Sequence, residues 1–193
     1  MARRKYQFKP DRQDAGFLNK LYITRAQRMT LLKWSLYSVL FLAALVIQDS
    51  VLSRYRIFDG LFDLAPTVII LVTVIQGSHS GSVFALAASM VYVFAGTGPG
   101  NYGFFLLTLY ACLAAVFREG FMRRSRGSIW MCSGAALALY ELTVFGIGLL
   151  MKITYSRRIW AFLVTILLSV LVMPALTPLV ERIGKIGGET WRE

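Results

Sequence analysis

The chain has 193 residues, 56% of them apolar, and a net charge of +11 that comes from 21 Lys or Arg against 10 Asp or Glu. Soluble domains average about 45–50% apolar residues. The composition therefore argues against a soluble domain, and the basic residues are separated by long apolar segments, which argues against nucleic acid as a partner.

Long uncharged segments predict a membrane domain. Residues 64–117 contain no charged residue over 54 positions, and residues 159–180 contain none either. Because a spanning helix needs about 20 mostly apolar residues and turn signals stand at 77–81 and 96–103, we predict an all-α bundle of six transmembrane helices. The predicted spans are 33–53, 63–77, 80–96, 102–117, 128–151 and 159–180. They form one domain over 33–180, between a basic amphipathic segment at 1–32 and a tail at 181–193.

The distribution of basic residues predicts the orientation. Sixteen Lys or Arg fall in 1–33, 118–127 and the tail, against five in the connections on the other side. Cytoplasmic loops carry the excess of basic residues, so both termini are predicted to lie in the cytoplasm. The segment "GFLNKLYITRAQRMTLLK" fits a basic amphipathic helix on the inner leaflet that contacts membrane lipids; docking of a cytoplasmic filament is the alternative.

Residues 98–103 match the dinucleotide-binding spacing G-x-G-x-x-G through Gly98, Gly100 and Gly103. That fingerprint requires a preceding strand, a following helix and an acidic residue about 20 positions on. Here a segment long enough to span a membrane precedes it, and the next acid, Glu119, lies beyond another span. We therefore predict a tight hairpin between two spans and no bound cofactor.

The bend "GSHSG" contains a second glycine pair. Gly77 and Gly81 lie four residues apart, a spacing that lets helix backbones approach closely. Packing inside the bundle is the favoured role and a partner-binding face is the alternative. His79 has no nearby carboxylate or thiol in the sequence, so no metal site is predicted.

Glu141 is the most informative single residue, because it lies near the middle of the predicted fifth span. A charged group at that depth costs about 2.5–3.5 kcal/mol on insertion scales, so it should face the bundle or a protein partner. It could relay protons or contact a ligand. We favour a structural hydrogen bond, for example to Tyr92 or Tyr110, because the neighbouring spans supply no further ionisable groups for a relay.

The first connection on the outer side, "DSVLSRYRIFDGLFDLAP", contains Asp49, Asp59 and Asp63. No Ser–His–Asp set or metal-ligand set accompanies these carboxylates, so we predict a positioning loop or docking surface and no catalytic residue. Candidate contact residues for a partner or for the bundle core in this connection are Tyr55, Phe58, Phe62 and Asp63.

The stretch "QDSVLSRYRIFDGLFDLAPTVIILVTVIQGSHSG" resembles the rod shape-determining protein family MreD. The matching positions are Gln48, Phe58, Gly60, Asp63, Leu64, Gly77, Gly81, Gly96 and Gly100. Members of that family often carry an Asp before the second glycine-rich bend, where this chain has Tyr92.

The resemblance implies a non-enzymatic scaffold of the bacterial cell-elongation machinery in the cytoplasmic membrane. Its implied partners are the bitopic protein MreC, the glycosyltransferase RodA with its class B penicillin-binding transpeptidase, and the MreB filament. The family is similar in fold to the substrate-binding subunits of energy-coupling-factor vitamin transporters, which supply the alternative function. Such subunits usually carry an Ala-x-x-x-Ala series on the first span, and "WSLYSVLFLAALVIQ" has none.

Overall fold

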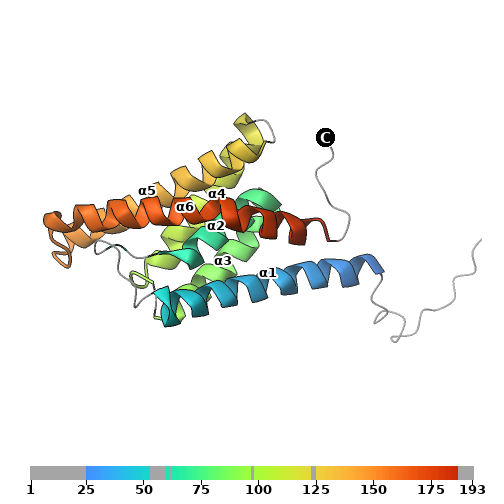
Figure 1. The fold of residues 1–193 in the computed structure, drawn as a ribbon, viewed down its shortest axis with the longest axis horizontal. Helices are drawn as coiled ribbons and strands as arrows, with labels where there is room; N and C mark the ends of the chain where they lie inside the picture. The colour runs from blue at the N-terminus through green and yellow to red at the C-terminus, as the bar shows by residue number, and fades with distance from the viewer. Residues whose placement is uncertain (1–24, 53–59, 61, 97, 123–124, 187–193) are drawn as a thin grey trace, which may run out of the picture.

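The computed structural model describes residues 25–52, 60, 62–96, 98–122 and 125–186 (Figure 1). Over these residues the chain is all-helical, without a β-strand. The elements are α1 (Arg25–Ser50), α2 (Leu64–Gln76), α3 (Ser78–Phe94), α4 (Gly103–Phe121), α5 (Arg126–Leu150), the 3-10 turn η3 (Ser156–Arg158) and α6 (Ile159–Gly184).

A helix lies at each of the six predicted spans, but in the described part of the chain only four helices, α1, α4, α5 and α6, are long and apolar enough to cross a membrane. Helices α2 and α3 are apolar but have 13 and 17 residues. At 1.5 Å per residue α2 rises about 20 Å, whereas the hydrocarbon core of a bilayer is about 30 Å thick. Helix α2 is therefore shorter than a complete crossing.

The first helix differs from the prediction at its start. Helix α1 begins at Arg25, so residues 25–32 continue into the first apolar run as one helix. The segment "RAQRMTLL" lacks Gly and Pro and is rich in good helix formers, so nothing interrupts the helix there. Helix α1 thus includes the end of the predicted amphipathic segment together with the first predicted span. Residues 1–24 of the predicted amphipathic segment lie outside the described residues.

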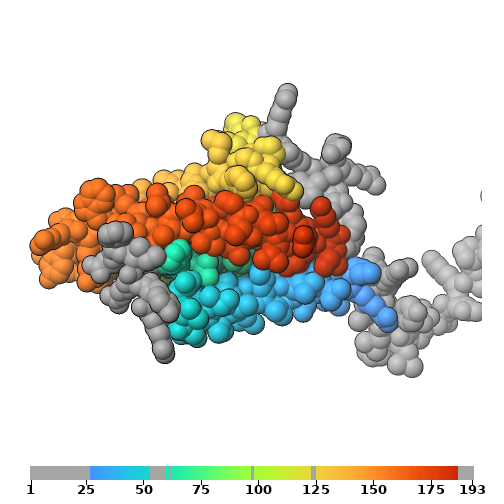
Figure 2. Space-filling model, in the orientation of Figure 1, coloured from blue at the N-terminus to red at the C-terminus, as the bar shows by residue number. Residues whose placement is uncertain are grey.

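Helix α2 is the centre of the bundle. Every residue from Ala65 to Ile75 is buried, and α2 contacts each of the other five α-helices. In Figure 2 only a small part of it is visible between α1 and α6. The most hydrophobic segment of the chain is thus enclosed by the five longer helices.

The surrounding helices expose apolar side chains on their outer faces. On α1 these include Leu31, Val39, Leu42 and Val46, and on α6 they include Trp160, Leu167 and Leu171. Exposed apolar area on this scale marks a surface that contacts membrane or protein rather than water. The arrangement is compatible with a multi-pass membrane protein.

The helices run alternately between two ends of the bundle (Figure 1). One end, here called the Gln48 end, holds the end of α1 and the connections α3–α4 and α5–α6. The other, the Gly184 end, holds the end of α6 and the connections α2–α3 and α4–α5. At the Gly184 end, Ser78 donates to the Glu119 carboxylate through its backbone N–H at 2.8 Å and its hydroxyl at 2.6 Å.

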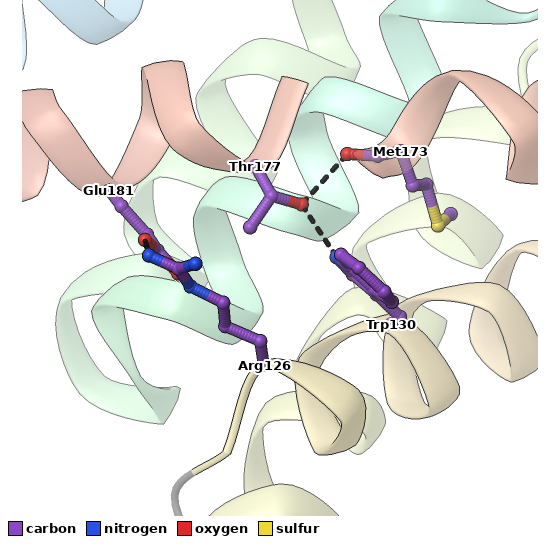
Figure 3. A network of polar contacts seen from close by, with 5 residues as sticks. All are labelled: Arg126, Trp130, Met173, Thr177 and Glu181. Atoms are coloured by element: carbon purple, nitrogen blue, oxygen red, sulfur yellow. Dashed lines mark hydrogen bonds and ion pairs between the residues drawn. The ribbon is translucent and has the colours of Figure 1, made fainter. Parts of the chain in front are cut away.

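Polar contacts also join α5 to α6 toward the Gly184 end (Figure 3). The Trp130 indole N–H donates to the Thr177 hydroxyl at 3.0 Å, and that hydroxyl donates to the Met173 carbonyl at 2.7 Å. Arg126 approaches Glu181 at 3.4 Å, but its side chain is 74% exposed. Exposed ion pairs contribute little, so the contact of Trp130 with Thr177 is the stronger link.

The described residues 95–96 and 98–102 connect α3 to α4, where the hairpin was predicted. Gly96 and Gly100 have φ of +76° and +119°, a region that favours glycine because it has no Cβ. The preceding element is helix α3 and not a strand, so the local setting required for dinucleotide binding is missing.

At Gly81, helix α3 lies against the backbone of α2. A Cβ at this position would lie 2.6 Å from the Thr73 carbonyl oxygen and 2.8 Å from the Thr73 Cα. Both atoms belong to the backbone, so a side chain at residue 81 would have to push the two helices apart. Gly77, the residue between the helices, has φ of +91°, and a Cβ there would collide with the Glu119 carboxylate.

We predict that Gly81→Ala lowers the free energy of unfolding by about 1–3 kcal/mol, the usual cost of overpacking. The matched control is Gly146→Ala in α5, where a Cβ meets no atom within 4 Å. Gly→Ala inside a helix stabilises by about 0.5–1 kcal/mol when space allows. Denaturant or thermal unfolding of both variants in detergent micelles measures the difference, and equal stability of the two would contradict close packing at Gly81.

Candidate functional site

Five polar residues from four helices, together with Asp63 just before α2, gather in the bundle toward the Gln48 end, and we call them the carboxyl cluster. They are Gln48, Asp63, Tyr92, Tyr140, Glu141 and Ser169. Asp63 and Glu141 were predicted from the sequence as separate features, one in a loop and one in a span. The fold brings them into contact.

Gln48 joins the end of α1 to the start of α2 through both atoms of its amide. Its Nε2 donates to Asp63 Oδ1 at 3.0 Å, and its Oε1 accepts the backbone N–H of Ala65 at 2.8 Å. The first N–H groups of a helix have no partner within the helix. The Asp63 side chain makes no capping bond to α2, so Gln48 supplies an acceptor that a local cap would otherwise provide.

The start of α2 is also tied to α6. The backbone N–H of Asp63 donates to the Ser169 hydroxyl at 3.0 Å. Ser169 is the eleventh residue of α6, which places it about 15 Å along that helix. Because α2 is short, its first turn therefore begins deep in the bundle, and Asp63 lies at the depth of Glu141.

Glu141 is 4% exposed, and its side chain hydrogen-bonds the Asp63 side chain. Of the two expected tyrosine partners, Tyr92 interacts electrostatically with Glu141 and Tyr110 lies against a different residue. Tyr110 pairs with the Thr143 hydroxyl at 2.7 Å, and Tyr92 hydrogen-bonds Gln48. The expectation of a single ionisable group in the bundle is also corrected, because the short α2 brings the Asp63 carboxyl inside.

Tyr140 completes the cluster from α5. The side chain is 2% exposed, and its hydroxyl has no hydrogen-bond partner among the described residues. It interacts electrostatically with both Asp63 and Glu141. Tyr92, at the position where the resemblance leads one to expect an Asp, is 3% exposed and lies in the same cluster.

The other candidate residues do not join this site. Gly77 and Gly81 lie near the Gly184 end, against Glu119 and the backbone of Thr73. Phe62 is half-buried beside Asp63 in the chain. Tyr55 and Phe58 lie outside the described residues, so the predicted docking surface at 53–65 is described only in part.

Chemically, the cluster offers two carboxyl groups and several hydroxyl groups. Among the described residues no three His, Cys, Asp or Glu side chains meet in a group that could hold a metal ion. Cys112 and Cys132 are both free thiols, with Cys112 beside the Ser82 hydroxyl at 3.1 Å. The cluster is suited to holding helices together through hydrogen bonds and to holding protons.

Sequence reasoning missed Ser169 and Tyr140 as members of the site. The available signal was weak, because a lone hydroxyl in an apolar helix often bonds only its own backbone. Gln48 stood out only through the family resemblance. Its position at the end of an apolar helix gave no indication of which helix it would contact.

We predict that Gln48→Leu lowers the free energy of unfolding by about 1–3 kcal/mol, because it leaves a buried acceptor and the Ala65 N–H without their partner. The control on the same helix is Ser38→Ala, since the exposed Ser38 hydroxyl bonds the Trp34 carbonyl within α1. The unfolding midpoints of Gln48→Leu and Ser38→Ala are measured in detergent micelles. Equal midpoints would show that Gln48 does not hold the start of α2.

Comparisons of the chain with protein-family models, with curated proteins and with solved structures give no match.

Proposed function

We propose that this chain is a membrane scaffold of the MreD kind, which binds and positions other membrane proteins of the bacterial cell-elongation machinery and transforms no substrate. It resides in the cytoplasmic membrane, with both termini in the cytoplasm. Its direct partner is a single-span protein of the MreC kind. Through that partner it helps to organise a RodA-type glycosyltransferase, its class B penicillin-binding transpeptidase and the MreB filament.

One observation carries the proposal. The residues that give the sequence its resemblance to MreD are also residues that assemble the tertiary structure. Gln48 binds Asp63 and the start of α2, and Gly81 allows α3 to meet the backbone of Thr73. Gly77 makes the turn between α2 and α3 with φ of +91°. Matching residue types at positions with such structural roles support a shared fold.

The outer faces of α1 and α6 support the binding role. Over the most apolar 18 residues of each helix, 22% of the α1 stretch and 17% of the α6 stretch are buried within the bundle. Their remaining faces carry apolar side chains, which suit contact with lipid or with another membrane helix. Phe62, next to the carboxyl cluster, is a candidate anchor on the outer side, because aromatic residues dominate many protein interfaces.

The proposed orientation gives a direct prediction. A cysteine placed at Asn101, in the α3–α4 hairpin, should react with an impermeant thiol reagent added outside intact cells. A cysteine at Ser125, just before α5, should react only after the membrane is opened. The basis is the excess of basic residues on the side of the termini. The reverse labelling pattern would overturn the orientation.

The proposed task predicts co-purification. Co-expression with the MreC-like protein of the same organism, followed by purification on a tag carried by one chain, should recover both. Phe62→Asp should reduce recovery of the partner by at least about tenfold, which corresponds to about 1.4 kcal/mol. Phe121→Asp is the matched control, because Phe121 is 80% exposed and lies near the Gly184 end.

Each variant is first purified alone, and a monodisperse elution profile establishes that it still folds. Equal loss of the partner with Phe62→Asp and Phe121→Asp would contradict a contact at Phe62. Recovery of the chain with ATPase subunits, or with a stoichiometric vitamin, would replace the scaffold by the transporter subunit.

A further inference from the structure

The contact between Asp63 and Glu141 has a chemical requirement. Ionised carboxylates only accept hydrogen bonds, and a carboxyl group donates one only when it is protonated. The two carboxyl side chains nevertheless lie within hydrogen-bonding reach of each other, with Glu141 4% exposed. We propose that Asp63 and Glu141 share one proton, that this proton joins α2 to α5, and that the stability of the bundle therefore depends on pH.

The surroundings fix the pair in place. Asp63 Oδ1 already accepts from Gln48 Nε2 at 3.0 Å, and the Asp63 backbone is held by Ser169 at 3.0 Å. Glu141 is 4% exposed and lies on a helix that contacts α2 and α6. Asp63 is half-buried and Glu141 is buried, and the contacts of Gln48 and Ser169 hold Asp63 beside Glu141. Two negative charges held this close repel each other, whereas one shared proton leaves a single charge and one hydrogen bond.

The groups that face the pair are amide and hydroxyl groups. They are Gln48 from α1, Tyr92 from α3, Tyr140 from α5 and Ser169 from α6, with Tyr102 at the start of α4 near Tyr140. Asp49, at the end of α1, is exposed. Arg54 and Arg56 lie outside the described residues. Within the described part of the chain, Asp63 and Glu141 are therefore joined directly, through the shared proton.

The Tyr140 hydroxyl is a second, independent sign of a protonation site. It is buried without a hydrogen-bond partner among the described residues and interacts electrostatically with both carboxyl groups. A buried polar group is normally paired. Next to the pair, this hydroxyl is available as a donor when the shared proton leaves.

The direction of the pH effect follows from linkage. In the unfolded chain the two carboxyl groups are separated and ionised at neutral pH. The folded chain therefore binds one proton more than the unfolded chain, and its stability falls as the pH rises. For one proton, the unfolding equilibrium constant should increase about tenfold for each pH unit.

The test measures unfolding of the full chain in detergent micelles from mildly acidic to mildly alkaline pH. In Glu141→Gln the side-chain amide N–H₂ can donate to Asp63 at every pH, so the pH dependence due to the pair should disappear. Asp63→Asn, which offers the same amide from the other side, should behave alike and serves if the first variant fails to fold. The control Glu181→Gln alters the same chemical group near the Gly184 end and should keep the wild-type dependence.

Infrared spectroscopy supplies a second readout. The folded wild-type chain should show the C=O stretching band of a protonated carboxyl group at neutral pH, and Glu141→Gln or Asp63→Asn should lack it. The proposal is overturned if the wild type lacks that band, or if both amide variants keep the wild-type pH dependence. It is also overturned if added sodium ions restore the stability lost at alkaline pH, because the pair would then hold a cation in place of the proton.

Discussion

The buried start of helix α2 is the constraint on which the rest of the structure depends. A 13-residue helix enclosed by five others must find partners for its first N–H groups inside the bundle, where water is scarce. Gln48 accepts one of them, from Ala65, and Ser169 accepts the N–H of Asp63 just before the helix. These two bonds fix α1 and α6 at the same depth against α2.

The carboxyl cluster follows from that placement. Asp63 lies just before the short helix, so the start of α2 carries a carboxyl group into the interior. There it meets Glu141 of α5, and the two acids hydrogen-bond each other. An isolated buried charge would be costly, but a bonded pair with polar neighbours fits the site. The need to satisfy the first backbone N–H groups of α2 thus also brings the two carboxyl groups into contact.

At the Gly184 end the helices are joined by different contacts. Gly81 lets α3 approach the backbone of Thr73, and Glu119 of α4 binds the first residue of α3. Close backbone approach at glycine suits membrane helices, because packing rather than exclusion of water drives their association. With both ends fixed around α2, the outer faces of α1 and α6 are left apolar and exposed.

The amino-acid sequence by itself determined the number and places of the helices, because long uncharged segments and glycine-rich bends are local signals. It also indicated that Glu141 must face protein, because a carboxyl group in an apolar segment has no other low-energy environment. Only the tertiary structure decided that its partner is Asp63. The choice of partner depends on how deep the short α2 lies among its neighbours, and that depth is set by packing between segments far apart in the chain, which no local pattern records.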